Sequence, residues 1–189
     1  MSEKIRCFLA IALPDQLKRQ LTEYVQNLKQ IAPHIRWTKT ENLHLTLKFL
    51  GEQPAIKLDQ LIANTIKAYS DIGPISLSTG IFGGFPNRRQ ARVFWLGVES
   101  DPEDSITRLH SRIEQSLEPL GFLSESKPYK AHLTLGRNKE RKKCQALWAF
   151  TQDHPFQAFR FTAHQIFLMR SILNKSGPKF SILQKFSLQ

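Results

Sequence analysis

Cysteine is scarce in this 189-residue sequence, which contains only Cys7 and Cys144. Two cysteines exclude the disulfide framework of small secreted domains and a zinc site with four thiolate ligands. The histidines show no spacing that is typical of a metal-binding motif. We therefore expect no metal and no other cofactor, and the cysteine usage is typical of a reduced, cytoplasmic protein.

The sequence also lacks a long hydrophobic run. No stretch approaches the roughly 20 apolar residues that are needed to span a bilayer. The apolar run at residues 5–13 is short and is interrupted by Arg6. We interpret it as a buried first strand, with a signal peptide as the alternative. A glycine-rich loop of the kind that binds nucleoside triphosphates is absent as well.

Acidic residues are few, with 16 Asp and Glu against 27 Lys and Arg and a net charge of +11. Such a charge favours a polyanionic partner such as RNA, DNA or an anionic membrane surface. Apolar residues make up 41% of the chain, which is enough for a packed core. At this length we expect one domain, or two small lobes that share a core.

Strand and helix patterns alternate along the chain. Apolar residues at helical spacing predict helices over 15–31, 55–69, 102–120 and 141–150. Short apolar or alternating runs predict strands over 5–13, 35–38, 42–50, 75–82, 92–98, 131–137, 156–162, 165–171 and 179–185. Residues 83–89 are rich in glycine, proline and arginine and read as a loop. The mixture indicates an α+β fold in which helices pack on one face of antiparallel sheets.

One tetrapeptide, His-Leu-Thr-Leu, occurs twice, at residues 44–47 and 132–135. Both copies lie in segments with a strand pattern. Side chains two positions apart in a strand point the same way, roughly 6.5–7 Å apart. Each copy therefore presents a His–Thr pair on one face and two leucines on the other. The alternative is a pair of ordinary half-buried strands with polar residues outward.

Two histidines and two threonines that meet at one place suit the opening of a 2′,3′-cyclic phosphate by water. One imidazole can take the proton of the water molecule and the other can protonate the departing ribose oxygen. The threonine hydroxyls can donate to the phosphate oxygens between them. This scheme requires no metal.

These motifs and their flanks resemble the two-histidine (2H) phosphoesterases, and within them the RNA 2′,3′-cyclic phosphodiesterases, also described as 2′–5′ RNA ligase-like proteins. The similar segments are RWTKTENLHLTLKFLG at 36–51, FPNRRQARVFWLGV at 85–98, and SIL with GPKF within 171–180. The resemblance implies one bilobal α+β domain over residues 1–189. It also implies pseudo-twofold symmetry, with two antiparallel sheets that line a central cleft and helices on the outer faces.

The same resemblance implies metal-independent hydrolysis of an RNA-terminal 2′,3′-cyclic phosphate to a 2′-phosphate, with 2′–5′ RNA ligation as a related reaction. By analogy, His44 is the general acid and His132 the general base, while Thr46 and Thr134 bind the phosphate. The chain departs from the family at Ala131, where a proline often precedes the second histidine.

Phe49 and Arg137 each follow their motif histidine by five positions. An aromatic face and a guanidinium plane can sandwich a nucleobase without reading its identity, and the resemblance supports this role. An offset of five points to the opposite face of a regular strand, so the role requires a bulge or a strand end, for which Gly51 and Gly136 are candidates. The alternatives are core packing for Phe49 and a solvated surface charge for Arg137.

Arg88 and Arg89 lie in the basic loop and could bind RNA phosphates. We therefore expect a monomeric enzyme whose partner is RNA with a 2′,3′-cyclic phosphate end, and no membrane partner. Two alternatives remain at this point. One is a non-catalytic RNA-binding module, and the other is a phosphodiesterase of small nucleoside cyclic phosphates.

Overall fold

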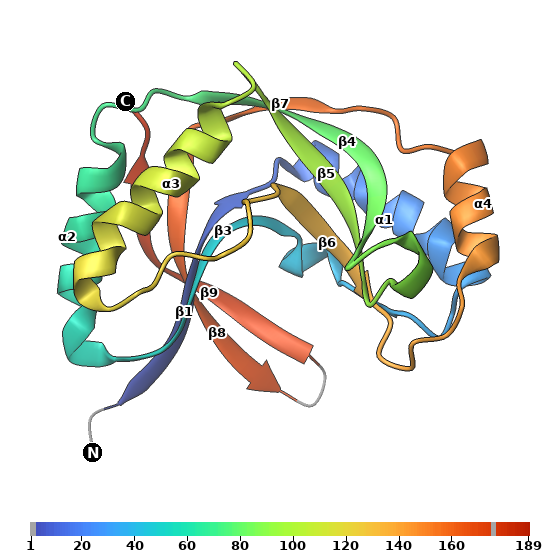
Figure 1. The fold of residues 1–189 in the computed structure, drawn as a ribbon, viewed down its shortest axis with the longest axis horizontal. Coiled ribbons are helices and arrows are strands. Elements are labelled where there is room, and N and C mark those ends of the chain that lie inside the picture. Colours follow the sequence, from blue (N-terminus) through green and yellow to red (C-terminus); the bar gives the residue numbers. More distant parts are fainter. Residues whose placement is uncertain (1–2, 175–176) are drawn as a thin grey trace.

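A curled, antiparallel sheet runs through the whole protein (Figure 1). The computed structural model describes residues 3–174 and 177–189. Within these residues the sheet has nine strands in the order β7-β4-β5-β6-β3-β1-β8-β9, with β2 paired to β6. The strands are β1 Lys4–Ala12, β2 Arg36–Trp37, β3 His44–Pro54, β4 Ile75–Phe85, β5 Val93–Asp101, β6 His132–Arg137, β7 Arg160–Ala163, β8 Gln165–Asn174 and β9 Gly177–Ser187.

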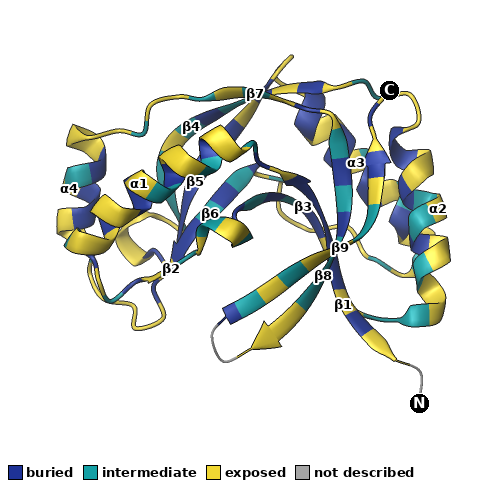
Figure 2. Ribbon diagram, turned by 180° about the vertical axis from the view of Figure 1, so that it is seen from behind, coloured by how far each residue is buried: buried dark blue, intermediate teal, exposed yellow. Residues whose placement is uncertain are grey.

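In the described part of the chain, four α-helices flank the sheet: α1 Asp15–Ile31, α2 Leu58–Tyr69, α3 Ser105–Leu117 and α4 Gln145–Asp153. Figure 1 shows α2 and α3 at one end of the molecule and α1 and α4 at the other. Each helix buries one apolar stripe. In α1 the buried side chains include Leu17, Leu21 and Leu28, a spacing that places them on one helical face. Figure 2 shows the exposed faces of these helices turned outward.

The two halves of the sheet join at its centre, where β3 and β6 pair antiparallel at Leu45 and Leu133. Both leucines are fully buried. The sequence predicted two sheets, whereas the structure joins them into one through this pairing. The predicted α+β class with antiparallel strands and outer helices is confirmed.

Most predicted elements are present with shifted ends. The loop predicted at 83–89 is wrong in its first half, because Gly83 and Gly84 belong to β4. The indole of Trp95 lies where a Cβ on Gly83 would be, so the glycine lets the ring pack flat on its neighbouring strand. The second half forms a short 3-10 turn, Arg88–Gln90. The helix predicted at 141–150 begins later, at Gln145.

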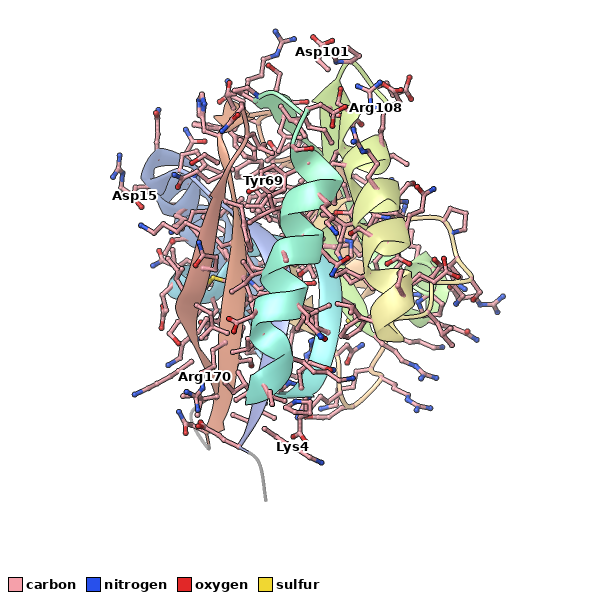
Figure 3. The ribbon with its side chains drawn as sticks, turned by 90° about the vertical axis from the view of Figure 1, so that its left-hand side faces the viewer. Lys4, Asp15, Tyr69, Asp101, Arg108 and Arg170 are labelled. Atoms are coloured by element: carbon pink, nitrogen blue, oxygen red, sulfur yellow. The ribbon has the colours of Figure 1, made fainter. Side chains whose placement is uncertain are left out.

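Figure 3 views the end of the molecule that carries α2 and α3, which lie side by side in front of the sheet. Tyr69, at the end of α2, is buried against Phe186 of β9, with 5.8 Å between ring centroids. The charged side chains of Arg108 and Arg170 lie at the periphery. Among the described residues, no helix combines the length and the hydropathy that crossing a membrane requires.

Candidate active site

Both copies of the repeat begin a central strand: His44 is the first residue of β3 and His132 the first of β6. The two strands are antiparallel neighbours that pair at the leucine following each histidine. In this register His44 lies opposite Thr134, and Thr46 lies opposite His132. Side chains directly opposite one another share a face of the sheet. We call the surface formed by His44, Thr46, His132 and Thr134 the His-Thr face.

The burial of the two strands follows one pattern. In each copy the histidine and the threonine are half-buried and both leucines are buried. The hydroxyls of Thr46 and Thr134 form no hydrogen bond within the described part of the chain. Both hydroxyls are therefore available to a ligand on the His-Thr face.

A β-bulge follows the threonine in each copy. In the pairing of β3 with β1, Leu47 has no residue of β1 opposite it. In the pairing of β6 with β5, Leu135 has no residue of β5 opposite it. One extra residue reverses the side-chain alternation, which turns Phe49 and Arg137 to the His-Thr face. Both side chains are exposed, Phe49 by 59%. The bulge that the offset of five required is thus present at Leu47 and Leu135, a second irregularity of β3 lies beside Gly51, and the exposure of Phe49 excludes its packing in the core.

The ring orientations of the two histidines are set in the same way. His44 Nδ1 lies 2.8 Å from the carbonyl oxygen of Asn42, and His132 Nδ1 lies 2.6 Å from that of Lys130. A carbonyl oxygen can only accept, so each Nδ1 donates its proton. Neither Nε2 is hydrogen-bonded within residues 3–174 and 177–189. Each ring therefore offers Nε2, as a base when neutral or as an acid when protonated.

The surroundings favour neutral imidazoles. Burial lowers the pKa of His44, the hydrogen bond to Asn42 raises it in part, and the nearby His132 lowers it further. Burial also lowers the pKa of His132, the bond to Lys130 opposes this, and the cations of Arg137 and Lys130 lower it again. A positive charge on His132 thus disfavours a second one on His44, in keeping with the shared face on which the register of β3 and β6 places both rings.

Aromatic rings enclose both histidines. Phe8 lies 4.8 Å from the ring of His44, and Phe180 stands edge-on to that ring at 5.2 Å. Phe85 stands edge-on to His132 at 4.9 Å. The sequence did not mark these rings as part of the site, because they come from distant segments, Phe85 read as a loop residue, and a phenylalanine by itself indicates only burial. These contacts cover part of each imidazole with apolar surface while the ring stays partly exposed.

Lys130 and Trp95 form a second missed feature beside His132. The Lys130 ammonium lies 4.3 Å from the centre of the Trp95 ring, within the range of a cation–π contact. Trp95 pairs with Thr134 in the sheet. This places a positive charge next to the second motif, and nothing in the sequence pattern marks it.

The arginines of the basic loop take different positions. Arg88 donates to Gln152 Oε1 at 2.9 Å and lies over the ring of Trp148, which directs it toward α4 and away from the histidines. Arg89 is exposed, with no side-chain partner among the described residues. Within the same residues, no three His, Cys, Asp or Glu side chains are grouped so that they could hold a metal ion.

Comparisons with known proteins match nearly the whole chain. The family model described as the 2′-5′ RNA ligase superfamily matches residues 13–174. An RNA 2′,3′-cyclic phosphodiesterase of Methanothermobacter thermautotrophicus is 32% identical, over 98% of this chain and 100% of that protein. The enzyme of the same name from Methanocaldococcus jannaschii is 31% identical, over 96% of this chain and 100% of that protein.

Solved structures show the same fold. A protein of Thermus thermophilus superposes with a TM-score of 0.79 and 26% identity, covering 97% of this chain and 98% of that one. Escherichia coli LigT in complex with 3′-AMP gives a TM-score of 0.78 and 23% identity, covering 98% and 99%.

Proposed function

This chain belongs to the 2′-5′ RNA ligase superfamily, and from that premise we propose that it is an RNA 2′,3′-cyclic phosphodiesterase. The substrate is an RNA whose last ribose carries a 2′,3′-cyclic phosphate, and the product is a 2′-phosphate with a free 3′-hydroxyl. The names of the two archaeal relatives support this activity. The net charge of +11 fits a polyanionic substrate.

One observation carries the proposal. Two histidines from distant parts of the chain meet across neighbouring strands, and each holds its Nδ1 proton on a carbonyl oxygen two residues earlier. Two equivalent Nε2 atoms are thereby presented to one region. A general base and a general acid that act on one phosphorus atom need this arrangement.

The reaction follows from the two Nε2 atoms. Neutral His132 takes a proton from water as the water oxygen forms a bond to phosphorus. The bond between phosphorus and O3′ breaks, and protonated His44 gives its Nε2 proton to O3′. His132 then holds the proton taken from water, and exchange with solvent restores both rings. We assign His132 as the base and His44 as the acid by analogy with the two-histidine phosphoesterases that the two motifs resemble.

The remaining side chains of the site bind the substrate. The Thr46 and Thr134 hydroxyls donate to the non-bridging oxygens and hold the phosphorus between the imidazoles. Phe49 and Arg137 stack on the terminal base from opposite sides. Arg89 contacts a phosphate further along the RNA. A 5′-hydroxyl RNA end reacts with a 2′,3′-cyclic phosphate by the same kind of proton transfers when it replaces water, and a 2′–5′ bond results.

We further propose that the two halves of the domain are related by pseudo-twofold symmetry. Ala12 pairs with His44 along β1, and Gly97 pairs with His132 along β5. The same bulge follows at the same distance from each histidine. This repetition supports a symmetric site in which either histidine approaches the phosphorus from its own half.

The test uses an RNA oligonucleotide with a 2′,3′-cyclic phosphate end, incubated with the protein in excess EDTA. We expect a 2′-phosphate product, identified by the mass of one added water and by chromatography beside synthetic 2′-phosphate and 3′-phosphate standards. His44→Ala and His132→Ala should each reduce the rate by about 10²-fold or more, the scale of a lost general acid or base. His164→Ala, which removes an exposed histidine of the loop between β7 and β8, should retain the rate.

Two results would contradict the proposal. Activity that survives either motif substitution would exclude the two-histidine mechanism. Tight RNA binding by the wild-type protein without any product would identify a non-catalytic RNA-binding module.

A further inference from the structure

A pocket of about 280 Å³ lies beside His44, between the turn at residues 39–42 and the beginning of β9. Its lining includes Lys39, Glu41, Asn42, Lys179 and Phe180. None of these residues belongs to the two motifs. The pocket is large enough for a single ribose-phosphate unit and too small for a longer segment of RNA.

The pocket shares its walls with the catalytic histidine. The carbonyl oxygen of Asn42 accepts the Nδ1 proton of His44 at 2.8 Å, and Phe180 stands against the His44 ring. The side-chain amide of Asn42 donates to the carbonyl oxygen of Pro178 at 3.0 Å. This bond ties the turn to β9, so the two walls of the pocket are fixed to each other and to His44.

Cations dominate the rim of the pocket. Neither the Lys39 nor the Lys179 ammonium forms an ion pair within the described residues, and both side chains reach solvent. The guanidinium of Arg36 lies against Gly177, which also lines the pocket. Glu41 supplies one carboxylate on the same lining. The combination offers ammonium groups for a phosphate and a carboxylate that can accept a hydrogen bond from a hydroxyl.

Resting on the function proposed above, we propose that this pocket binds the ribose of the penultimate nucleotide and the phosphate that joins it to the terminal nucleotide. A hydrolysis substrate continues in the 5′ direction alone, so the first backbone unit beyond the terminal nucleotide must leave the site past one of the histidines. Lys39 and Lys179 bind its phosphate. Glu41 accepts a hydrogen bond from its 2′-hydroxyl, the group that distinguishes RNA from DNA.

The test compares two substrates, an oligonucleotide with a 2′,3′-cyclic phosphate end and a nucleoside 2′,3′-cyclic phosphate. The double variant Lys39→Ala/Lys179→Ala should lose about tenfold in kcat/KM on the oligonucleotide and much less on the mononucleotide, which has no 5′ phosphate. For the double variant on the oligonucleotide, the slope of log kcat/KM against log salt concentration should be shallower by about 0.7 than for the wild-type protein. This is the value for one phosphate contact on a single strand. Lys29→Ala/Lys185→Ala, with the same charge change at exposed positions on α1 and the far end of β9, should change neither quantity.

A second comparison tests the hydroxyl contact. With the wild-type protein, an oligonucleotide with deoxyribose at the penultimate position should react several-fold more slowly than the all-ribose substrate. With Glu41→Ala, the two substrates should react at equal rates. An equal loss on both substrates in the lysine double variant, or the same loss in the control double variant, would overturn the proposal. If the wild-type protein still hydrolyses the mononucleotide, the proposed phosphodiesterase function is retained and only the pocket proposal fails. If the wild-type protein hydrolyses neither substrate, the proposed function itself is wrong.

Discussion

The hydroxyl of Tyr129 donates a 2.8 Å hydrogen bond to the backbone carbonyl of Thr46. This bond connects the two motifs. Thr46 belongs to the first motif, and Tyr129 directly precedes Lys130, whose carbonyl oxygen orients His132 of the second motif. The Tyr129 ring also stacks on His110 of α3, with 3.9 Å between centroids. One tyrosine thus fixes the approach to β6 against the strand that carries His44.

Tyr129→Phe should therefore lower both stability and turnover. Loss of one buried hydrogen bond costs about 0.5–1.5 kcal/mol, and a looser approach to β6 should reduce kcat more than it raises KM. Urea denaturation and steady-state kinetics measure the two effects. Tyr69→Phe is the matched control, since the Tyr69 hydroxyl has no hydrogen bond within the described residues. An unchanged kcat in Tyr129→Phe would show that the bond does not position His132.

The buried ion pair of Lys48 and Glu114 anchors β3 to α3. Both side chains are almost completely buried, and Lys48 also donates to the Leu123 carbonyl at 3.1 Å. Lys48→Met leaves a buried carboxylate without its cation and should cost about 3–5 kcal/mol of unfolding free energy. Lys48→Met/Glu114→Leu should cost less than the sum of the two single substitutions, as measured by chemical denaturation.

The control for this ion pair is an exposed one. Lys142 and Glu140 lie 2.6 Å apart with both side chains more than half exposed. Lys142→Met should change the unfolding free energy by about 1 kcal/mol or less. Additive costs in the buried double variant would show that Lys48 and Glu114 do not stabilise the fold as a pair.

The pH dependence of kcat/KM should be bell-shaped, with its maximum on the acidic side of pH 6.5, the ordinary pKa of histidine. The base must be neutral, so activity falls below its pKa; the acid must be protonated, so activity falls above its pKa. Both pKa values are lowered from 6.5, by burial first. Profiles of the free enzyme on the oligonucleotide measure these two limbs. A maximum above about pH 7.5 would contradict the assignment, because it lies a full unit above the unshifted value.

Arg137→Gln should move one limb in a known direction. The Arg137 cation lowers the pKa of His132, so its removal raises that pKa and moves the corresponding limb to higher pH. Arg160→Gln, an exposed position on β7, should leave both limbs in place. A shift of equal size in both variants would indicate an effect of net charge and not of proximity.

Phe49→Ala should separate binding from stability. With 59% of its surface exposed, Phe49 contributes little to the core, and the unfolding free energy should change by about 0.5 kcal/mol or less. Loss of stacking on a base costs about 1–3 kcal/mol of binding, so KM should rise at least several-fold while Phe49→Trp restores it. Ile56→Ala, which truncates an exposed apolar side chain elsewhere, is the control. An unchanged KM in Phe49→Ala would exclude the stacking role.

Local patterns were sufficient for much of the fold. The predicted helix at 15–31 has the bounds of α1, because its apolar spacing and the proline before it are short-range signals. The C-terminal end of β4 was not predictable, since Gly83 and Gly84 read as loop residues until Trp95 packs on Gly83 and Ala91 and Trp148 pack on Gly84. The distinction between two sheets and one rested on the pairing of Leu45 with Leu133, which no local pattern encodes.

The candidate site divides in the same way. The sequence alone determined how the side chains of each motif divide between the two faces of its strand. The period of a strand places each histidine and threonine on one face and each leucine on the other. Tertiary structure alone decided that the motifs adjoin, that bulges at Leu47 and Leu135 turn Phe49 and Arg137 to the same face, and that Tyr129 ties the motifs together. These depend on contacts between residues far apart in the chain, whose geometry exists only after the strands have paired.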